Sequence, residues 1–334
     1  MSRRYVDQLR DGDTLDDIYL VTDKQLKVNR NGNPYIQVDL RDRTGSIQAR
    51  LWNAGEAIFR SFENGDFLHA NGRSQLHQGT LQVILTSFEK VEPQKVELTD
   101  FLPHTEHDVG KLMERLRGYL LRLANPHLRA LCECYLMDDA FMRGFTTCPA
   151  GVKMHHAYVG GLLEHVVTML DIADKLAPLY AGVDRDLLLV GVFLHDSGKV
   201  RELTYRRAFG YSDEGQLVGH LAIGVSMLTE LAAKTVELTG EPMPRELLLR
   251  LHHMILSHHG TLEHGSPRVP MTPEAMLLYH IDTLDTRMHM VIREMKEDRN
   301  NPTAWTPYNA NLGRRFYKGG AAGDLYGVGG EAYD

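Results

Sequence analysis

The chain has 334 residues, a length that favours about two domains of ordinary size. Its 43% hydrophobic and 24% charged residues are typical of a folded globular protein, which excludes a disordered or fibrous chain. The formal net charge of −7 excludes a protein that attracts polyanions through its overall charge, so any contact with nucleic acid must be a local patch.

Two absences in the sequence bear on where the protein works. No apolar run reaches the roughly 18 to 20 uncharged residues that a membrane-spanning helix needs, and the first residues contain no stretch of signal-peptide type. Three cysteines, Cys132, Cys134 and Cys148, are too few for a disulfide framework and match no zinc-site spacing. We therefore expect a cytoplasmic protein without membrane contact, with its cysteines as small core residues.

The first part of the chain alternates apolar and polar residues with the period of two that is typical of strands. For example, Ile36, Val38 and Leu40 point to one side while their neighbours point to the other. The five predicted strands cover residues 18–28, 34–41, 46–52, 67–75 and 80–88. A short helical segment over 54–62 separates the third strand from the fourth, which predicts the order β-β-β-α-β-β.

This order resembles the OB-fold of nucleic-acid-binding proteins, including the stretch LRDRTGSIQARLW of residues 40–52. The resemblance implies that the outer face of the second and third strands binds single-stranded nucleic acid. That face carries rings for base stacking and guanidinium groups for phosphate: Tyr35, Gln37, Arg41, Gln48, Arg50 and Trp52. We predict Tyr35, Arg50 and Trp52 as contacts, and six basic against two acidic residues between Lys24 and Arg50 support this. The alternative role for Trp52 is to close the barrel end.

The remainder of the chain has the periodicity of helices. Residues 93–105 contain two prolines and no sustained pattern, which predicts a linker between an OB domain over 1–92 and an all-helical domain over 106–298. Helices are predicted in this domain over 161–177, 186–197, 218–238, 244–258 and 273–297, after leucines that recur every three or four residues. The Gly-rich residues 299–334 predict a flexible tail. The fold class is therefore multidomain α+β, a five-stranded barrel followed by an all-α domain.

Histidine is the unusual residue, because 12 of the 17 histidines fall within residues 155–289. The central segment is LLVGVFLHDSGK, residues 188–199, an apolar helix that ends in His195 and Asp196 and is followed by Lys199. Burying an imidazole, a carboxylate and an ammonium group together is costly unless something compensates the charges. A bound cation would do so, and the segment therefore predicts a metal site.

Seven residues follow one another along 150–295 in an order that resembles the HD superfamily of metal-dependent phosphohydrolases: His165, His195, Asp196, His220, His258, His259 and Asp282. The resemblance implies two metal ions bridged by Asp196. It implies that His165, His195 and Asp282 complete one site and that the other three histidines complete the second. Asp285 stays an alternative to Asp282, because residues three apart lie near the same face of a helix.

The predicted ligands indicate the metal and the chemistry. Nitrogen-rich sets suit transition metals, so we expect two divalent ions, manganese first, with iron, cobalt, nickel or zinc as alternatives. Two ions about 3.5 to 4 Å apart can generate a hydroxide nucleophile and neutralise charge on a phosphate. Asp196 and Lys199 are the predicted catalytic residues, Lys199 as a stabiliser of negative charge; an exposed lysine at a helix end is its alternative. His155 and His156 match a histidine pair of the family's nuclease branch, which implies contact with the scissile phosphate.

The combination of the two domains, with the stretches HHAYVGGLLEH, HDSGK and SHHG, is similar to the YhaM-type 3′ to 5′ exoribonucleases over most of residues 1–300. The resemblance implies metal-dependent release of nucleoside monophosphates from the 3′ end of single-stranded RNA, with single-stranded DNA as a further candidate substrate. Two alternatives stay open. One is an HD phosphohydrolase that acts on a small nucleotide and uses the barrel for regulation or assembly, and the other is a non-catalytic RNA-binding protein with a structural metal site. A homo-oligomer is compatible with the apolar helices, but the sequence fixes no number.

Overall fold

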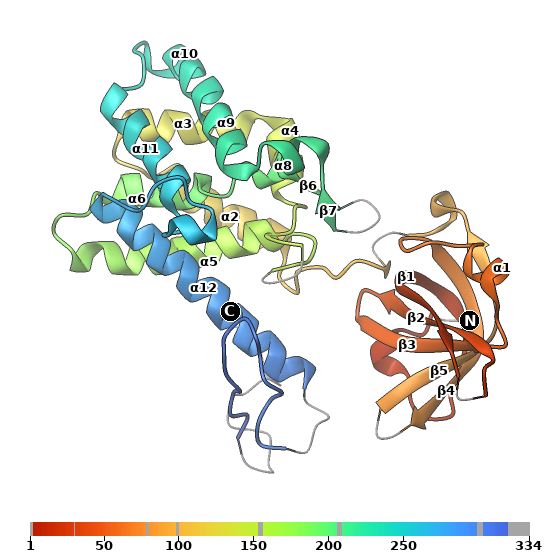
Figure 1. Ribbon diagram of the computed structural model, residues 1–334. Coiled ribbons are helices and arrows are strands. Elements are labelled where there is room, and N and C mark those ends of the chain that lie inside the picture. The colour runs from red at the N-terminus through yellow and green to blue at the C-terminus, as the bar shows by residue number, and fades with distance from the viewer. Residues whose placement is uncertain are drawn as a thin grey trace. The chain divides into compact units, whose positions relative to one another are not determined.

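The computed structural model describes residues 3–29, 31–77, 80–97, 100–152, 156–205, 209–298 and 303–319. They separate into two compact units, one within Met1–Glu106 and Thr204–Gly210 and the other within His107–Leu203 and Tyr211–Asp334 (Figure 1). Among the described helices, none combines the length and the apolar character that a membrane span requires.

The first unit is a closed barrel with the strand order β1-β2-β3-β5-β4. A short 3-10 helix, η1 (Val6–Gln8), precedes the strands β1 (Thr14–Val28), β2 (Pro34–Asp42), β3 (Gly45–Trp52), β4 (Phe67–His77) and β5 (Thr80–Val91), and α1 (Glu56–Phe59) lies between β3 and β4. β1 closes the barrel by pairing with both β2 and β4, and β3 pairs with β5 in parallel. The predicted order of elements along the chain, β-β-β-α-β-β, is confirmed.

The alternation of the strands separates the inside of the barrel from its surface. Ile36, Val38 and Leu40 are buried and pack in one cluster with Tyr19. The pairing of β4 with β5 shifts its register at Gly72, where an added Cβ would stand 2.4 Å from a backbone oxygen of β5. Only glycine, which has no Cβ, allows this close approach of β4 to β5. Gly72 is therefore needed for the register shift between the two strands.

Part of the predicted linker packs on the barrel. After β5, η2 (Pro93–Lys95) forms, and the buried Phe101 then lies edge-on against Phe67 with ring centroids 4.7 Å apart. Tyr5 Oη also donates to Asp100 at 2.8 Å. The prolines interrupt the strand pattern as expected. The burial of Phe101 could not be predicted, because the residues around it show no apolar periodicity.

The second unit is helical around a buried centre. Its helices are α2 (Val109–Leu120), α3 (Pro126–Met137), α4 (Asp139–Phe145), α5 (Gly161–Leu176), α6 (Arg185–Leu194), α7 (Lys199–Glu202), α8 (Asp213–Leu217), α9 (His220–Lys234), α10 (Val236–Thr239), α11 (Arg245–Ser257) and α12 (Pro273–Glu297). Short elements connect them: η4 (Ala177–Leu179), η5 (Leu262–His264) and the paired strands β6 (Leu203–Thr204) and β7 (Gly210–Tyr211). The helix predicted over 218–238 is divided into α9 and α10.

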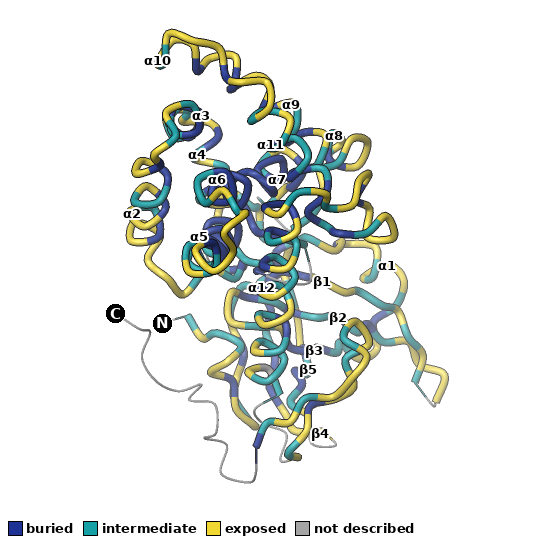
Figure 2. Tube along the Cα trace, turned by 90° about the vertical axis from the view of Figure 1, so that its left-hand side faces the viewer, coloured by how far each residue is buried: buried dark blue, intermediate teal, exposed yellow. Residues whose placement is uncertain are grey.

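Helix α6 is the centre of this unit. Every residue from Leu187 to Leu194 is buried, and α5, α11 and α12 pack against the helix (Figure 2). It begins at the N-cap Asp184, whose side chain accepts a hydrogen bond from the backbone of Leu187 at 3.0 Å. Because α6 is surrounded on all sides, the residues that follow it are delivered into the interior.

Part of the expected flexible tail is folded. Within residues 303–319, Trp305 pairs with Tyr317 and Asn309 with Arg314 as antiparallel bridges. The high glycine content of the surrounding sequence concealed this small hairpin. Residues 299–302 and 320–334 of the predicted tail lie outside the described part of the chain.

Candidate metal centre

The seven side chains predicted as ligands meet in the interior of the helical unit. They come from α5 (His165), the turn after α6 (His195 and Asp196), the start of α9 (His220), the end of α11 (His258 and His259) and the middle of α12 (Asp282). Asp196 lies at the centre, and nitrogens of four histidines lie 3.3 to 4.0 Å from its carboxylate oxygens.

The two oxygens of Asp196 face different groups. Oδ2 lies 3.3 Å from His195 Nε2 and 4.0 Å from His165 Nε2. Oδ1 lies 3.5 Å from Nε2 of His258 and 3.6 Å from Nε2 of His220. On the first side His165 Nε2 lies 3.4 Å from Asp282 Oδ1, and on the second side the Nε2 atoms of His220 and His259 are 3.3 Å apart.

This spacing is that of donors around cations. The donor atoms of His165, His195 and Asp282 all lie within 4.8 Å of one another, and so do those of His220, His258 and His259. Three buried atoms of the cluster have no hydrogen-bond partner among the described residues: His195 Nε2, Asp196 Oδ1 and His259 Nδ1. Each such atom costs about 1 to 3 kcal/mol, which a metal ion at the centre would recover. The residues present therefore fit a pair of metal ions.

Each imidazole next to Asp196 is oriented from behind, through its other nitrogen. His195 Nδ1 and His258 Nδ1 lie 2.7 and 2.8 Å from carbonyl oxygens of the preceding helical turn. Glu202 Oε1 lies 3.0 Å from His220 Nδ1, and Asp285 Oδ2 lies 2.7 Å from His165 Nδ1. These contacts turn all four Nε2 atoms toward Asp196, as outer partners of metal-binding histidines do.

The sequence missed Glu202 as an orienting residue and left the role of Asp285 open. Asp282 and Asp285 contact opposite nitrogens of the same imidazole, so Asp282 faces the centre and Asp285 lies behind His165. The three-residue spacing could place both near one helix face, but it could not distinguish these positions. For Glu202, the only available signal was an acidic residue soon after the HDSGK stretch.

Charge in the centre is unbalanced toward the negative side. Burial lowers the pKa of His165, but hydrogen bonds with Asp282 and Asp285 outweigh burial and raise this pKa to about 10. The same hydrogen bond with His165 holds the pKa of Asp282 well below its usual range, although burial opposes this. The carboxylates therefore favour positive charge at this position, whether it is a proton or a metal ion.

Glycines allow the ligand-bearing segments to approach. A Cβ added at Gly198 would stand 2.1 Å from the carbonyl oxygen of His220, so the first turn of α9 can lie against the Asp196 turn only without a side chain there. Gly260, with φ +82°, follows the His258–His259 pair, and a Cβ added there would stand 2.1 Å from the ring of Tyr279 in α12. Gly198 thus lies where the Asp196 turn meets α9, and Gly260 lies where the segment after α11 meets α12.

Lys199 lies inside the centre and not at the surface. It is buried, and its Nζ donates to Asp196 Oδ2 at 2.6 Å and to the carbonyl oxygen of Ala150 at 2.7 Å. Burial lowers the pKa of Lys199, but the adjacent Asp196 carboxylate outweighs burial and raises it. The alternative of an exposed lysine at a helix end is therefore wrong.

His156, predicted to contact the scissile phosphate, has both ring nitrogens engaged by other residues of the protein. His156 is buried with φ +42°, and its ring nitrogens lie 2.7 Å from Tyr158 Oη and 2.9 Å from Asp285 Oδ2. Its ring also stacks on His289 at 4.0 Å. The sequence could not show that a carboxylate 129 residues away engages this imidazole. The second member of the pair, His155, lies outside the described residues.

The predicted nucleic-acid contacts of the barrel lie together on its outer face. Tyr35 stands opposite Trp52 in the pairing of β2 with β3, and their ring centroids are 4.8 Å apart. Trp52 is 40% exposed, so its ring is accessible at this edge. Arg50 lies on the same strand and donates to Gln48 at 3.1 Å. The face therefore offers aromatic surface next to a guanidinium group.

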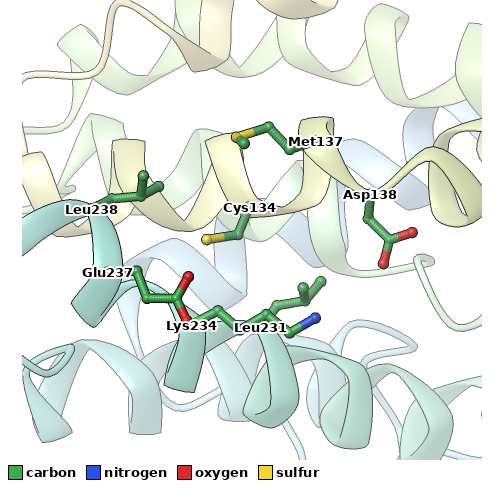
Figure 3. Close-up of a pocket in the computed structure, with 7 residues that line it drawn as sticks. All are labelled: Cys134, Met137, Asp138, Leu231, Lys234, Glu237 and Leu238. Atoms are coloured by element: carbon green, nitrogen blue, oxygen red, sulfur yellow. The ribbon is translucent and has the colours of Figure 1, made fainter.

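A separate hollow of about 220 Å³ lies between α3, α9 and α10 (Figure 3). Its lining includes Cys134 and Met137 of α3 and Lys234 of α9, and none of its seven lining residues is a predicted ligand. It is smaller than the roughly 300 to 1,000 Å³ of usual ligand sites. The three cysteines are free thiols, with Cys132 and Cys148 buried, as expected for core residues.

Known proteins share both parts of this chain. Residues 20–91 match the family described as the OB-fold nucleic acid binding domain, and residues 162–287 match the HD domain. The chain is 35% identical over 309 residues to the 3′-5′ exoribonuclease YhaM of Bacillus subtilis (strain 168), covering 92% of this chain and 95% of that protein. It is 36% identical over 315 residues to the protein of the same name from Bacillus velezensis, covering 92% and 95%. Among solved structures, the mitochondrial single-stranded DNA binding protein Rim1 of S. cerevisiae covers 25% of this chain and 98% of its own at 12% identity, with a TM-score of 0.21.

Proposed function

The chain belongs to the YhaM family of 3′-5′ exoribonucleases, and from this premise we propose that it releases nucleoside monophosphates from the 3′ end of single-stranded RNA with two divalent metal ions. The observation that carries the proposal is the position of Asp196, whose two oxygens face two separate groups of histidines. A carboxylate in this position can be shared by two cations, an arrangement that supports in-line hydrolysis of a phosphodiester.

The proposed ligands follow from this geometry. His165, His195 and Asp282 would hold one ion, the groups of α9 and α11 (His220, His258 and His259) would hold the other, and Asp196 would be common to both. Donors dominated by imidazole suit transition metals, and we propose manganese, with iron, cobalt, nickel or zinc as alternatives. When bound, such a pair activates a water molecule and offsets the charge on the phosphate.

The protein's own residues prepare the site for this chemistry. Glu202 and Asp285 hold the imidazoles of His220 and His165 so that each Nε2 points inward. Lys199, bonded to Asp196 Oδ2, fixes the orientation of the central carboxylate and adds a positive charge close to where a phosphate would bind. Because these groups are already in place, little rearrangement accompanies the reaction.

The outer face of the barrel would hold the RNA strand. Stacking of bases on Tyr35 and Trp52 with a phosphate contact from Arg50 suits single strands of any sequence. Single-stranded DNA offers the same bases and phosphates, and it stays the second candidate substrate. RNA as substrate favours a cytoplasmic location. Whether the chain assembles into a homo-oligomer can be measured by analytical ultracentrifugation.

The test uses 5′-labelled single-stranded RNA with an open or a blocked 3′ end, in manganese or in EDTA, beside a panel of free nucleotides. We expect a ladder of successively shorter labelled products and free nucleoside monophosphates, only with the open end and only with metal. Hydrolysis of free nucleotides without attack on open RNA would support the small-nucleotide phosphohydrolase instead. Binding of RNA without hydrolysis in any divalent metal would contradict the proposed activity.

A further inference from the structure

The hairpin of residues 303–319, here called the C-terminal hairpin, has an unusual composition. It contains three basic residues and no acidic residue, in a chain whose formal net charge is −7. It also contains four aromatic residues within this short stretch: Trp305, Tyr308, Phe316 and Tyr317. Neither the barrel face nor the metal centre uses these residues.

The C-terminal hairpin is a built element and lies at the end of α12 (Figure 1). Thr306 and Phe316 are joined by a backbone hydrogen bond of 2.9 Å, and Thr306 Oγ1 accepts from the backbone of Phe316 at 3.0 Å. A second backbone hydrogen bond of 2.9 Å joins Asn309 to Arg314. The turn contains Gly313 with φ +65°. These bonds give the exposed side chains a defined arrangement.

Two side chains attach the C-terminal hairpin to the end of α12. Asn309 Nδ2 donates to Glu294, and Lys318 Nζ donates to Asp298 Oδ2 at 2.6 Å. The Lys318 ammonium offsets the charge of Asp298, whereas the neutral amide of Asn309 leaves the charge of Glu294 in place. Arg314 and Arg315 are both exposed and form no ion pair with either carboxylate among the described contacts.

Three of the four aromatic side chains of the C-terminal hairpin are exposed to solvent. Trp305 is 51%, Tyr308 62% and Tyr317 45% exposed, and the rings of Trp305 and Tyr317 lie 5.1 Å apart. Clustered exposed rings indicate a binding surface. Rings beside guanidinium groups are the surface on which single-stranded nucleic acid stacks, while its phosphates contact the cations.

Helix α12 relates this surface to the metal centre, because one unbroken helix carries Asp282 and ends at the hairpin. Asp298 follows Asp282 by sixteen residues, or roughly 24 Å along the axis. At about 3.4 Å per stacked nucleotide this is a span of about seven nucleotides. The C-terminal hairpin is thus too far away to touch the scissile bond, but it can contact the strand on the 5′ side of that bond.

We propose that the C-terminal hairpin is a second binding site for single-stranded RNA, which holds the part of the strand that has not yet been cut. The inference rests on the proposed function for the nature of its ligand. A contact between two copies of this chain is the competing explanation for exposed rings. The hairpin's basic residues and the absence of acidic residues within its described part favour RNA. RNA carries one negative charge per nucleotide, whereas a second copy of this chain has a net charge of only −7 spread over 334 residues.

The experiment measures binding of 5′-fluorescein-labelled single-stranded RNA to the full chain by anisotropy, in EDTA to prevent cleavage and over a series of salt concentrations. The variants are Tyr308→Ala and the double variant Arg314→Ala/Arg315→Ala. Matched controls are Tyr180→Ala and Arg122→Ala, which change exposed residues elsewhere in the helical unit. Circular dichroism and thermal unfolding show that each variant is folded.

We expect Tyr308→Ala to weaken binding about fivefold or more, since base stacking on a ring contributes about 1 to 3 kcal/mol. The double arginine variant should weaken binding about tenfold and reduce the slope of log K against log salt by about 1.4, which corresponds to two phosphate contacts. The variant Arg314→Lys/Arg315→Lys should restore that slope. The controls should match the wild type.

The outcomes separate this inference from the proposed function. Wild-type protein that neither binds nor cuts RNA contradicts the proposed function. Wild-type binding with unchanged affinity and salt slope in both hairpin variants overturns the second site and leaves the proposed function intact. Unchanged RNA affinity with an altered sedimentation coefficient would assign the C-terminal hairpin to a contact between copies, and it would also overturn the inference.

Discussion

The outer face of the barrel and the metal centre obtain their residues in opposite ways. Tyr35 and Trp52 face each other across neighbouring strands, so a local alternation pattern is enough to place them together. The metal centre gathers side chains from five segments, and it exists only when the helices around α6 are assembled. The two regions should therefore respond differently to substitution. Removing one stacking residue of the barrel face should lower RNA affinity only partly, whereas removing the Asp196 carboxylate should affect both groups of ligands at once.

The largest effect should therefore come from the carboxylate at the centre. Asp196→Asn removes the charge of the carboxylate whose two oxygens face the two groups of histidines, and we expect RNA hydrolysis to fall by about 10³-fold or more, since metal-ion stabilisation contributes several kcal/mol. Initial rates on labelled RNA and the metal content of the purified protein measure the effect. RNA affinity in EDTA serves as the control and should stay within about twofold. Turnover close to that of the wild type would break the comparison.

The second prediction separates the two aspartates of α12. Asp282→Asn should remove metal from one site, whereas Asp285→Asn, which acts through the His165 imidazole, should weaken metal affinity by about 10- to 100-fold without abolishing binding. Manganese titration followed by electron paramagnetic resonance gives both affinities. Equal losses in the two variants would show that the position behind His165 is itself a ligand position.

These two aspartates also show where reading the sequence stops. The cost of burying His195, Asp196 and Lys199 together pointed to a metal site, and the resemblance to the HD superfamily then supplied the other residues that converge. It could not reveal that His156 turns inward to Asp285 or that Lys199 reaches the carbonyl of Ala150, since these contacts join distant parts of the chain. The prolines of residues 93–105 gave no sign that Phe101 packs on the barrel, and the glycines after residue 299 gave no sign of the hairpin over 303–319.

A third, smaller effect tests whether the helices that carry the ligands are held together away from the metal centre. The buried Glu274 at the start of α12 accepts from the backbone of Asp184 at 2.8 Å and pairs with Arg250 at 2.9 Å. Burial raises the pKa of Glu274, but these hydrogen bonds outweigh burial and lower it from the ordinary value of 4.5. Three helices, α6, α11 and α12, therefore depend on one carboxylate.

Because the pKa of Glu274 is lower in the folded protein, its contribution is fully present above the ordinary value and is lost as pH falls through the folded value. Glu274→Gln should reduce the free energy of unfolding by about 1 to 2 kcal/mol at neutral pH, a moderate figure since Arg250 is partly exposed. Denaturant unfolding from neutral pH to below 4.5 measures the difference, which should shrink at the acid end. A difference independent of pH would assign the loss to packing instead of charge.

The smallest effect is expected on the barrel face, and it sharpens the comparison most directly. Trp52→Ala removes a half-exposed ring that contacts Tyr35, and we expect about a fivefold loss in affinity for long single strands, while Trp52→Phe should retain most of it. Arg50→Ala should reduce the salt slope by about 0.7, the value for one phosphate contact on a single strand. A dinucleotide is too short to occupy an extended platform and the metal centre together, so its cleavage should fall much less than that of a long strand. Equal losses on both substrates would mean that Trp52 only closes the barrel end. The barrel face would then not be a surface where single substitutions reduce RNA affinity step by step, and the contrast with the metal centre would be wrong.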